Sequence, residues 1–253
     1  MIKLPNSLRW NGREIPIEGA MERALKSEQD TPHREEEAQN SSENLNGYIW
    51  VPSIKAHFAK NRNLNGLNWN QAVDKIYSQG IIVEGKRAEM PTAFEFMSYL
   101  KYLLSGNIKG LKEKERQDIL NDILKTGDYR GNWLNARFVE HNKGFKNLGI
   151  ETLELDSSGN ARKKTEPLEQ CLWEDCLADI NSFNKQGLLT KPYGSGYEQG
   201  KNVHFYYPRE ESVARFDAGS GGAGLLCGRY PDYSSSSLRV RLIVRPEGAS
   251  SKI

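Results

Sequence analysis

Three cysteines and four histidines are the residues of this chain with the clearest capacity for nucleophilic or metal chemistry. Cys171 and Cys176 have no standard zinc spacing, and an odd number of cysteines argues against a disulfide framework. The histidines are scattered and form no H-x-x-x-H or H-x-H pair. We therefore expect the cysteines to be small buried side chains, and we expect no metal site and no cofactor.

A second arrangement with chemical potential is the motif G-x-G-x-x-G at Gly219, Gly221 and Gly224, which follows a predicted strand. The dinucleotide fingerprint needs a helix directly after these glycines, because the helix N-terminus holds the pyrophosphate. Here the chain continues as LLCGRYPDYSSSS, in which Pro231 and the serines disfavour a helix. A flexible linker is excluded as well, since a predicted terminal strand follows and must pair with earlier strands. We expect the segment to lie at the edge of the sheet and in its loops.

The composition limits the classes of function. The chain has 253 residues, of which 37% are hydrophobic, and this length suits one large domain or two small ones; we expect a single domain over residues 1–253. Its net charge of +2 gives no reason to expect nucleic-acid binding. No apolar stretch reaches the roughly 20 residues that span a bilayer, and the N-terminus lacks the apolar region of a signal peptide. We expect cytoplasmic synthesis and no membrane insertion, which is compatible with display on a virion or a cell surface.

Residues 26–46 are strongly polar and predict a mobile loop.

Helical periodicity occurs mainly in the first half of the chain. Residues 68–80 and 91–106 have apolar side chains at helical spacing, and the second segment opens with a T-x-x-E capping box. Residues 111–127 predict a third helix that ends at a glycine, as the first two do. Residues 171–183 have helical spacing too and predict a fourth helix.

Strand patterns dominate the rest of the chain. Residues 47–54 predict a buried strand, and residues 148–168 predict a hairpin around a D-S-S-G-N turn. Residues 202–208 and 212–218 alternate, and residues 238–244 place leucine and valine on one face and two arginines on the other. The expected fold class is α+β, with helices packed on a small antiparallel sheet that the C-terminal strands complete.

The composition of residues 219–238 is unusual within this chain. The segment contains no Lys, Glu, Gln, Met or Trp, although Lys and Glu are frequent elsewhere. These five are the amino acids that cannot arise from an Asn codon when its two adenines are replaced. The segment is rich in Tyr, Ser and Gly, which antibody-like binding surfaces favour, because Tyr gives contact area at low entropic cost and Ser and Gly adapt their hydrogen bonds.

Residues 212–243, SVARFDAGSGGAGLLCGRYPDYSSSSLRVRLI, resemble the variable region of a diversity-generating retroelement variable protein. Such proteins have a C-type lectin fold of the formylglycine-generating-enzyme type. MPTAFEFMSYL, residues 90–100, is similar to the (L/M)PT-x-x-E helix start of that fold class, and the end of the chain is similar to its R-x-x-P-D … I-G-F-R ending. The chain departs from the family at Arg239, where a glycine is usual. Between about residues 111 and 200 the resemblance is loose and implies an insertion-rich body.

The resemblance implies a non-catalytic ligand-binding protein whose C-terminal surface is diversified by adenine-directed mutagenesis. It implies a buried frame of Val213, Ala214, Phe216, Arg229, Pro231, Leu238, Val240 and Leu242. It also implies solvent-facing varied positions that bind an unknown protein or surface ligand, namely Gly219, Gly221, Gly222, Gly224, Leu226, Gly228, Tyr230, Asp232, Tyr233, Ser235 and Ser237. Polar substitutions at such positions are expected to leave stability nearly unchanged. The two tyrosines are the expected anchors, and the alternative for both is packing at the edge of the core.

Two other functions remain open at this point. The first is a formylglycine-generating-type oxidoreductase, which in the family uses a pair of cysteines near the C-terminal end. Only Cys227 lies in that region here, and the histidines offer no cluster for the related iron-dependent branch. The second is a fixed structural or tail protein of a virus, which is compatible with ligand binding.

Overall fold

The chain divides into two compact units, Met1–Asn44 and Leu45–Ile253, and each is considered by itself. In the first unit, β1 (Ser7–Trp10) pairs antiparallel with β2 (Arg13–Pro16). The computed structural model describes residues 7–10, 13–16, 45–106, 108–156 and 158–246.

The predicted mobile loop at residues 26–46 lies outside the described residues, apart from its last two positions. Of these two, Leu45 is buried and belongs to a hydrophobic cluster of the second unit. The expectation of a single domain over residues 1–253 stays a prediction.

Three of the four predicted helices are present. They are α3 (Trp69–Val73), which continues as a π-helical segment (Asp74–Ser78), α4 (Ala93–Leu104) and α5 (Glu113–Leu124). The capping box of α4 is confirmed, because Thr92 Oγ1 accepts from the Glu95 backbone N at 3.2 Å while Glu95 Oε2 accepts from the Thr92 backbone N at 2.8 Å.

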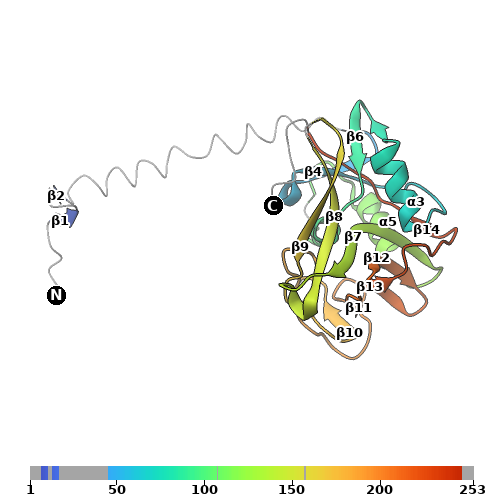
Figure 1. The fold of residues 1–253 in the computed structure, drawn as a ribbon. Helices are drawn as coiled ribbons and strands as arrows, with labels where there is room; N and C mark the ends of the chain where they lie inside the picture. The colour runs from blue at the N-terminus through green and yellow to red at the C-terminus, as the bar shows by residue number, and fades with distance from the viewer. Residues whose placement is uncertain (1–6, 11–12, 17–44, 107, 157, 247–253) are drawn as a thin grey trace. The chain divides into compact units, whose positions relative to one another are not determined.

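A mixed eight-stranded sheet forms the body of the second unit (Figure 1). Its strands run in the order β10-β11-β13-β12-β7-β8-β9, and β14 pairs with β7. Most pairs are antiparallel, whereas β11 with β13 and β14 with β7 are parallel. The strands are β7 (Arg130–Glu140), β8 (Leu148–Leu155), β9 (Ala161–Pro167), β10 (Cys176–Asp179), β11 (Asn202–Tyr206), β12 (Ser212–Gly219), β13 (Gly222–Arg229) and β14 (Leu238–Arg239).

A second sheet has five short strands in the order β3-β4-β15-β6-β5. The C-terminal strand β15 lies at its centre and pairs with β4 and β6, so the C-terminal segment completes this sheet as expected. The strands are β3 (Tyr48–Val51), β4 (Ala56–Ala59), β5 (Ile82–Val83), β6 (Lys86–Glu89) and β15 (Ile243–Val244).

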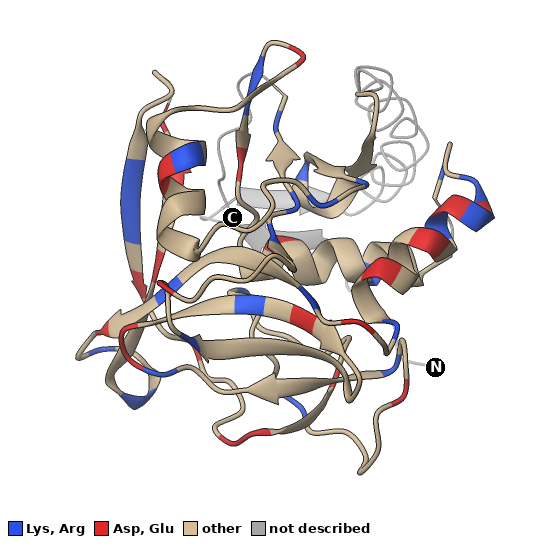
Figure 2. Cartoon of the chain, turned by 90° about the vertical axis from the view of Figure 1, so that its right-hand side faces the viewer, with Lys and Arg blue, Asp and Glu red and all other residues tan. Residues whose placement is uncertain are grey.

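The larger sheet separates two hydrophobic clusters. Helix α4 contacts β7 and α5 contacts β12 and β13, and their apolar side chains share the larger cluster. Successive residues of β7 point to opposite faces, so Leu134 belongs to this cluster while Trp133 belongs to the second one with α3. Helix α4 carries few charged residues and α5 carries many (Figure 2), which matches the deeper burial of α4.

Three sequence-based expectations about the fold are wrong. Residues 171–183 contain strand β10 and no helix, because their backbone pairs with distant segments, for example Leu172 N with Leu189 O at 2.9 Å. The larger sheet is neither small nor purely antiparallel, and its long central strand β7 was not anticipated. The predicted strand at residues 238–244 is split into β14 and β15.

The split in the last strand coincides with a buried arginine. Arg241 was expected on the exposed face of a half-buried strand, but its side chain is fully buried. Its Nη2 lies 2.6 Å from Asp122 Oδ2, and its Nη1 donates to the backbone carbonyls of Ala59 and Lys60. Because the guanidinium finds these partners inside the protein, the alternation of the sequence does not decide its exposure.

Candidate ligand-binding surface

The glycine-rich segment forms the end of a β-hairpin. Strands β12 and β13 pair antiparallel and turn between Gly219 and Gly222. Strand β13 lies between β12 and β11, so the expectation that the segment lies at the edge of the sheet is wrong. Strand β13 begins at Gly222, contains Gly224 and continues to Arg229, where the dinucleotide fingerprint needs a helix, so these glycines do not form a dinucleotide-binding turn.

The two faces of β13 have different surroundings. Ala223, Leu225 and Cys227 point into the larger cluster, so Gly224 and Leu226 point to the opposite face. Both of these are nevertheless buried, with Leu226 only 5% exposed, and the expectation that they face solvent is wrong. A sheet face becomes solvent-exposed only where no other element covers it, and sequence alternation does not reveal such a cover.

Gly224 is buried because β11 lies close against it. A Cβ atom at this position would lie 2.7 Å from the His204 carbonyl oxygen and 2.9 Å from the His204 Cβ. At Gly222 the backbone has φ +128°, and a Cβ would lie 2.7 Å from the Tyr197 ring. At Gly221, in the turn, a Cβ would meet nothing within 4 Å. Glycines of the same hairpin therefore differ sharply in how much substitution their surroundings allow.

The segment between β13 and β14 leaves the sheet and carries the most exposed aromatic residue of the described chain. Tyr230 is 79% exposed and Tyr233 is 49% exposed. The segment is anchored at the start of α3, where Trp69 N donates to Pro231 O at 3.0 Å and Asn70 Nδ2 donates to Asp232 Oδ1 at 2.6 Å. The alternative of packing at the edge of the core therefore does not apply to Tyr230. Tyr233 is exposed, but its ring also lies 5.2 Å from the Arg215 guanidinium.

The far end of this segment is fixed by the central strand of the sheet. Ser237 O accepts from Gly131 N at 3.2 Å and from Arg62 Nη1 at 3.3 Å. Leu238 then begins β14 and is fully buried. Of the eleven predicted positions, the exposed ones are Gly221, Tyr230, Asp232 and Tyr233, the half-buried ones are Gly219, Gly222, Gly228, Ser235 and Ser237, and the buried ones are Gly224 and Leu226.

The predicted frame is buried at most of its positions. Arg229 and Pro231 are half-buried. The other six are at most 3% exposed, namely Val213, Ala214, Phe216, Leu238, Val240 and Leu242.

A buried arginine lies next to Tyr233 and Tyr129. The guanidinium of Arg215, a β12 residue that is 2% exposed, lies 4.9 Å from the Trp133 ring, 5.7 Å from the Tyr129 ring and 5.2 Å from the Tyr233 ring. These distances are in the range of cation–π contacts, which gain strength when the cation is removed from water. Arg215 therefore links Tyr233 of the loop to Tyr129, which precedes β7.

The charge of Arg215 is balanced by Asp217 on the same strand. Two contacts of 2.7 Å join them, Nε to Oδ1 and Nη2 to Oδ2, and Tyr129 Oη donates to Asp217 Oδ2 at 3.1 Å. Burial raises the pKa of Asp217, while the adjacent guanidinium opposes this shift. Burial and the Asp217 carboxylate raise the pKa of the Tyr129 phenol, which therefore keeps its proton for donation. Arg215 Nη1 is buried and has no hydrogen-bond partner in the described part of the chain.

Sequence reasoning did not find two exposed tyrosines of this surface. Tyr129 is 39% exposed and Tyr206 is 40% exposed, and Tyr206 lies opposite Leu226 in the β11–β13 pairing. No sequence signal connects either tyrosine to residues 219–238. By contrast, the alternation of residues 212–218 could have placed Arg215 and Asp217 together on one face of a strand.

The cysteines lie in surroundings that disfavour thiolate chemistry. Cys227 is fully buried, and burial, with a smaller contribution from nearby Cys171, raises its pKa well above the usual value. Burial raises the pKa of Cys171 to about 12. Since the thiolate is the reactive form, both groups are weak nucleophiles at neutral pH.

Two further findings concern metals and membranes. Among the described residues, no three His, Cys, Asp or Glu side chains are grouped so that they could hold a metal ion. No helix in the described ranges is long and apolar enough to span a bilayer.

Comparisons with protein-family models, with curated proteins and with solved structures find no match to this chain.

Proposed function

We propose that this chain is a ligand-binding protein with a C-type lectin fold, whose C-terminal surface is diversified by a retroelement and recognises a protein or surface ligand without catalysis. The observation that carries the proposal is a pair of exposed tyrosines, Tyr129 and Tyr233, whose rings both lie within cation–π distance of the buried Arg215. Tyr230 and Tyr233 come from the predicted varied segment, and Tyr129 lies against the same guanidinium as Tyr233. Tyrosines and arginines are the residues that most often dominate binding energy at protein interfaces.

The hydrogen bonds that hold both ends of residues 230–237 favour this proposal. Residues 230–237 leave a hydrogen-bonded strand, are tied to α3 and β7, and return to a buried leucine. A scaffold that fixes both ends of a segment can accept many sequences between them. The capping box of α4 stands at the position of the family's helix start, and the last strand returns to the centre of a sheet. Both features are consistent with the lectin-type fold.

The ligand would contact an aromatic surface with polar groups beneath it. The Arg215 guanidinium lies 5.2 Å from the Tyr233 ring, and its unpartnered Nη1 is a donor for an oxygen of the ligand once that ring is displaced. Such a combination of large aromatic contacts and one directed donor is typical of adaptable protein-binding surfaces.

The catalytic alternative receives less support from the geometry. A formylglycine-generating-type oxidoreductase would need reactive thiols, and burial raises the pKa of Cys171 and Cys227. A fixed structural protein of a virus differs from the proposal only in lacking sequence variation, so variation is the property to measure.

The test is to sequence the 3′ end of this gene, with the DNA downstream, from many cells of one population. We expect a downstream near-copy of codons 212–243 that carries Asn codons, with differences confined to adenine positions. We expect amino-acid variation at exposed positions such as Tyr230, Asp232 and Tyr233. The matched internal control is the pair Leu225 and Cys227, which lie in the same segment, point into the core and should not vary.

An invariant 3′ end without a downstream copy would refute diversification. Variation spread equally over exposed codons and over those of Leu225 and Cys227 would refute the division into frame and surface. If diversification is found, alanine at Tyr230 should weaken capture of the ligand, with little change in stability because the side chain is 79% exposed.

A further inference from the structure

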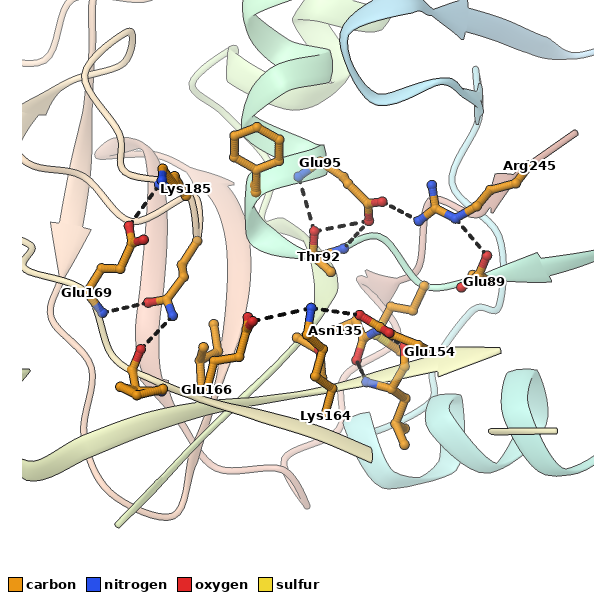
Figure 3. A pocket seen from close by; sticks show the side chains of 17 residues that line it. Glu89, Thr92, Glu95, Asn135, Glu154, Lys164, Glu166, Glu169, Lys185 and Arg245 are labelled. Carbon is orange, nitrogen blue, oxygen red and sulfur yellow. Dashed lines mark hydrogen bonds and ion pairs between the residues drawn. The ribbon is translucent and has the colours of Figure 1, made fainter. Parts of the chain in front are cut away.

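A cavity of about 370 Å³ lies between the start of α4, strand β6 and the β8–β9 hairpin (Figure 3). This volume is within the range of small-molecule sites. No residue between Ser212 and Ile243 lines the cavity. It is therefore separate from the surface to which the proposed function is assigned, and a test of one does not depend on the other.

One wall of the cavity holds two carboxylates that share a single guanidinium. Arg245 pairs with Glu95 through Nη2 and with Glu89 through Nε, the latter at 3.0 Å. The other oxygen of Glu95 is used by the capping box with Thr92. Glu89 is 8% exposed, and its second oxygen has no partner among the described residues. A buried carboxylate with a free oxygen thus lines the cavity, and burial raises the pKa of Glu89 although Arg245 opposes the shift.

The facing wall is formed by the β8–β9 hairpin. Lys164 Nζ lies 3.3 Å from Glu154 Oε1 and 3.3 Å from Glu166 Oε1, so an ammonium group of the protein itself bridges two carboxylates there (Figure 3). All the lining residues together include five glutamates against two lysines and one arginine, a formal net charge of −2. The cavity therefore favours a cation over an anion.

Apolar side chains lie between the charged groups. Met90, Phe94, Ile150 and Leu153 line the same cavity. In the described part of the chain no three carboxylates, histidines or cysteines converge as a metal site requires. Carboxylates that are spread along a partly apolar cavity match an elongated organic cation better than a compact metal ion.

We propose that this cavity binds a small aliphatic diamine or polyamine. One ammonium group donates to the free oxygen of Glu89, and the methylene chain contacts the apolar side chains of the lining. The second ammonium group binds Glu154 and Glu166 and competes there with Lys164. The ligand class follows from the lining alone and does not rest on the proposed function of the C-terminal surface.

The proposal is tested by titrating the full chain with diaminopentane in a calorimeter at neutral pH and low salt, with pentanediol as the neutral analogue of equal length. We expect one saturable site for the diamine and none for the diol. Glu89→Gln should weaken binding about tenfold or more, because a charge-assisted hydrogen bond is lost. Lys164→Gln should strengthen binding, because it removes the competing ammonium group of the protein.

The matched control is Glu151→Gln. Glu151 pairs with Lys163 on the same hairpin and does not line the cavity, so this variant removes an equal charge nearby and should bind as the wild type does. Glu154→Gln, at a residue with a side chain 32% exposed, tests the facing wall if Glu89→Gln does not fold. Equal binding of diamine and diol, unchanged binding in Glu154→Gln, or equal weakening in Glu151→Gln and Glu154→Gln would overturn the proposal.

Discussion

Gly224 and Gly221 lie three positions apart in one hairpin and are expected to respond oppositely to the same substitution. A Cβ at Gly221 meets nothing within 4 Å, whereas a Cβ at Gly224 would lie 2.7 Å from the His204 carbonyl oxygen. Because that oxygen belongs to the backbone of the paired strand β11, a side-chain rotation cannot relieve the contact. Gly224→Ala therefore has to displace one strand from its neighbour.

The magnitude follows from two opposing contributions. Replacing glycine by alanine stabilises a compatible site by about 0.4–1 kcal/mol through the unfolded chain, and this contribution is common to both variants. Overpacking in a closely packed interior costs about 1–3 kcal/mol, and only Gly224→Ala incurs it. The difference between the two variants should thus be about 1–3 kcal/mol in the free energy of unfolding. For a chain of this size each kcal/mol corresponds to about 2–4 °C in Tm.

The assay is urea unfolding and thermal melting of both variants beside the wild type. We expect Gly221→Ala to match or slightly exceed the wild type and Gly224→Ala to melt several degrees lower. If the two variants are equally stable, β11 can move at no cost, and the inference from the Cβ contact is refuted. Position 224 would then accept larger side chains, as expected for the solvent-facing position predicted from the sequence.

Three other predictions concern the core, the thiols and a helix cap. Phe216→Ala should cost about 3–5 kcal/mol in unfolding free energy, since this ring is 1% exposed and lies 5.0 Å from that of Phe96; a loss below 1 kcal/mol in urea unfolding would contradict its place in the core. In the native protein a thiol reagent should modify half-buried Cys176 first and reach the other two cysteines only after unfolding, which mass spectrometry of modified peptides can show; prompt native labelling of Cys227 would revive thiol chemistry. Thr92→Ala should lower the free energy of unfolding by about 1 kcal/mol, because the helix loses its N-cap. Thr92→Ser should lower the free energy of unfolding much less, because the serine hydroxyl can still accept from Glu95 N. Equal losses for the two variants in urea unfolding would argue against the cap.

The sequence by itself determined the elements whose signals are local. The capping box at Thr92 and Glu95, the glycine after each helix and the alternation of residues 212–218 each reflect hydrogen bonds or side-chain directions set within a few residues. They predicted α3, α4, α5 and β12 correctly. The α+β class followed from these elements.

Tertiary structure alone decided which faces are covered. Gly224 and Gly221 are the same residue type in the same motif, but Gly224 is buried because β11 lies against it, whereas Gly221 is exposed in the turn. The predicted helix at residues 171–183 failed because its backbone groups pair with segments distant in sequence, which outweighs a local periodicity.

The same limit applies to the candidate binding surface. Tyr230 and Tyr233 were found from the sequence, but Tyr129 is associated with Tyr233 only through the Arg215 guanidinium, which lies within cation–π distance of both rings. The cavity beside Glu89 likewise combines residues from α4, β6 and the β8–β9 hairpin with Arg245. Burial and charge pairing depend on neighbours in space, and a linear sequence does not specify those neighbours until the chain has folded.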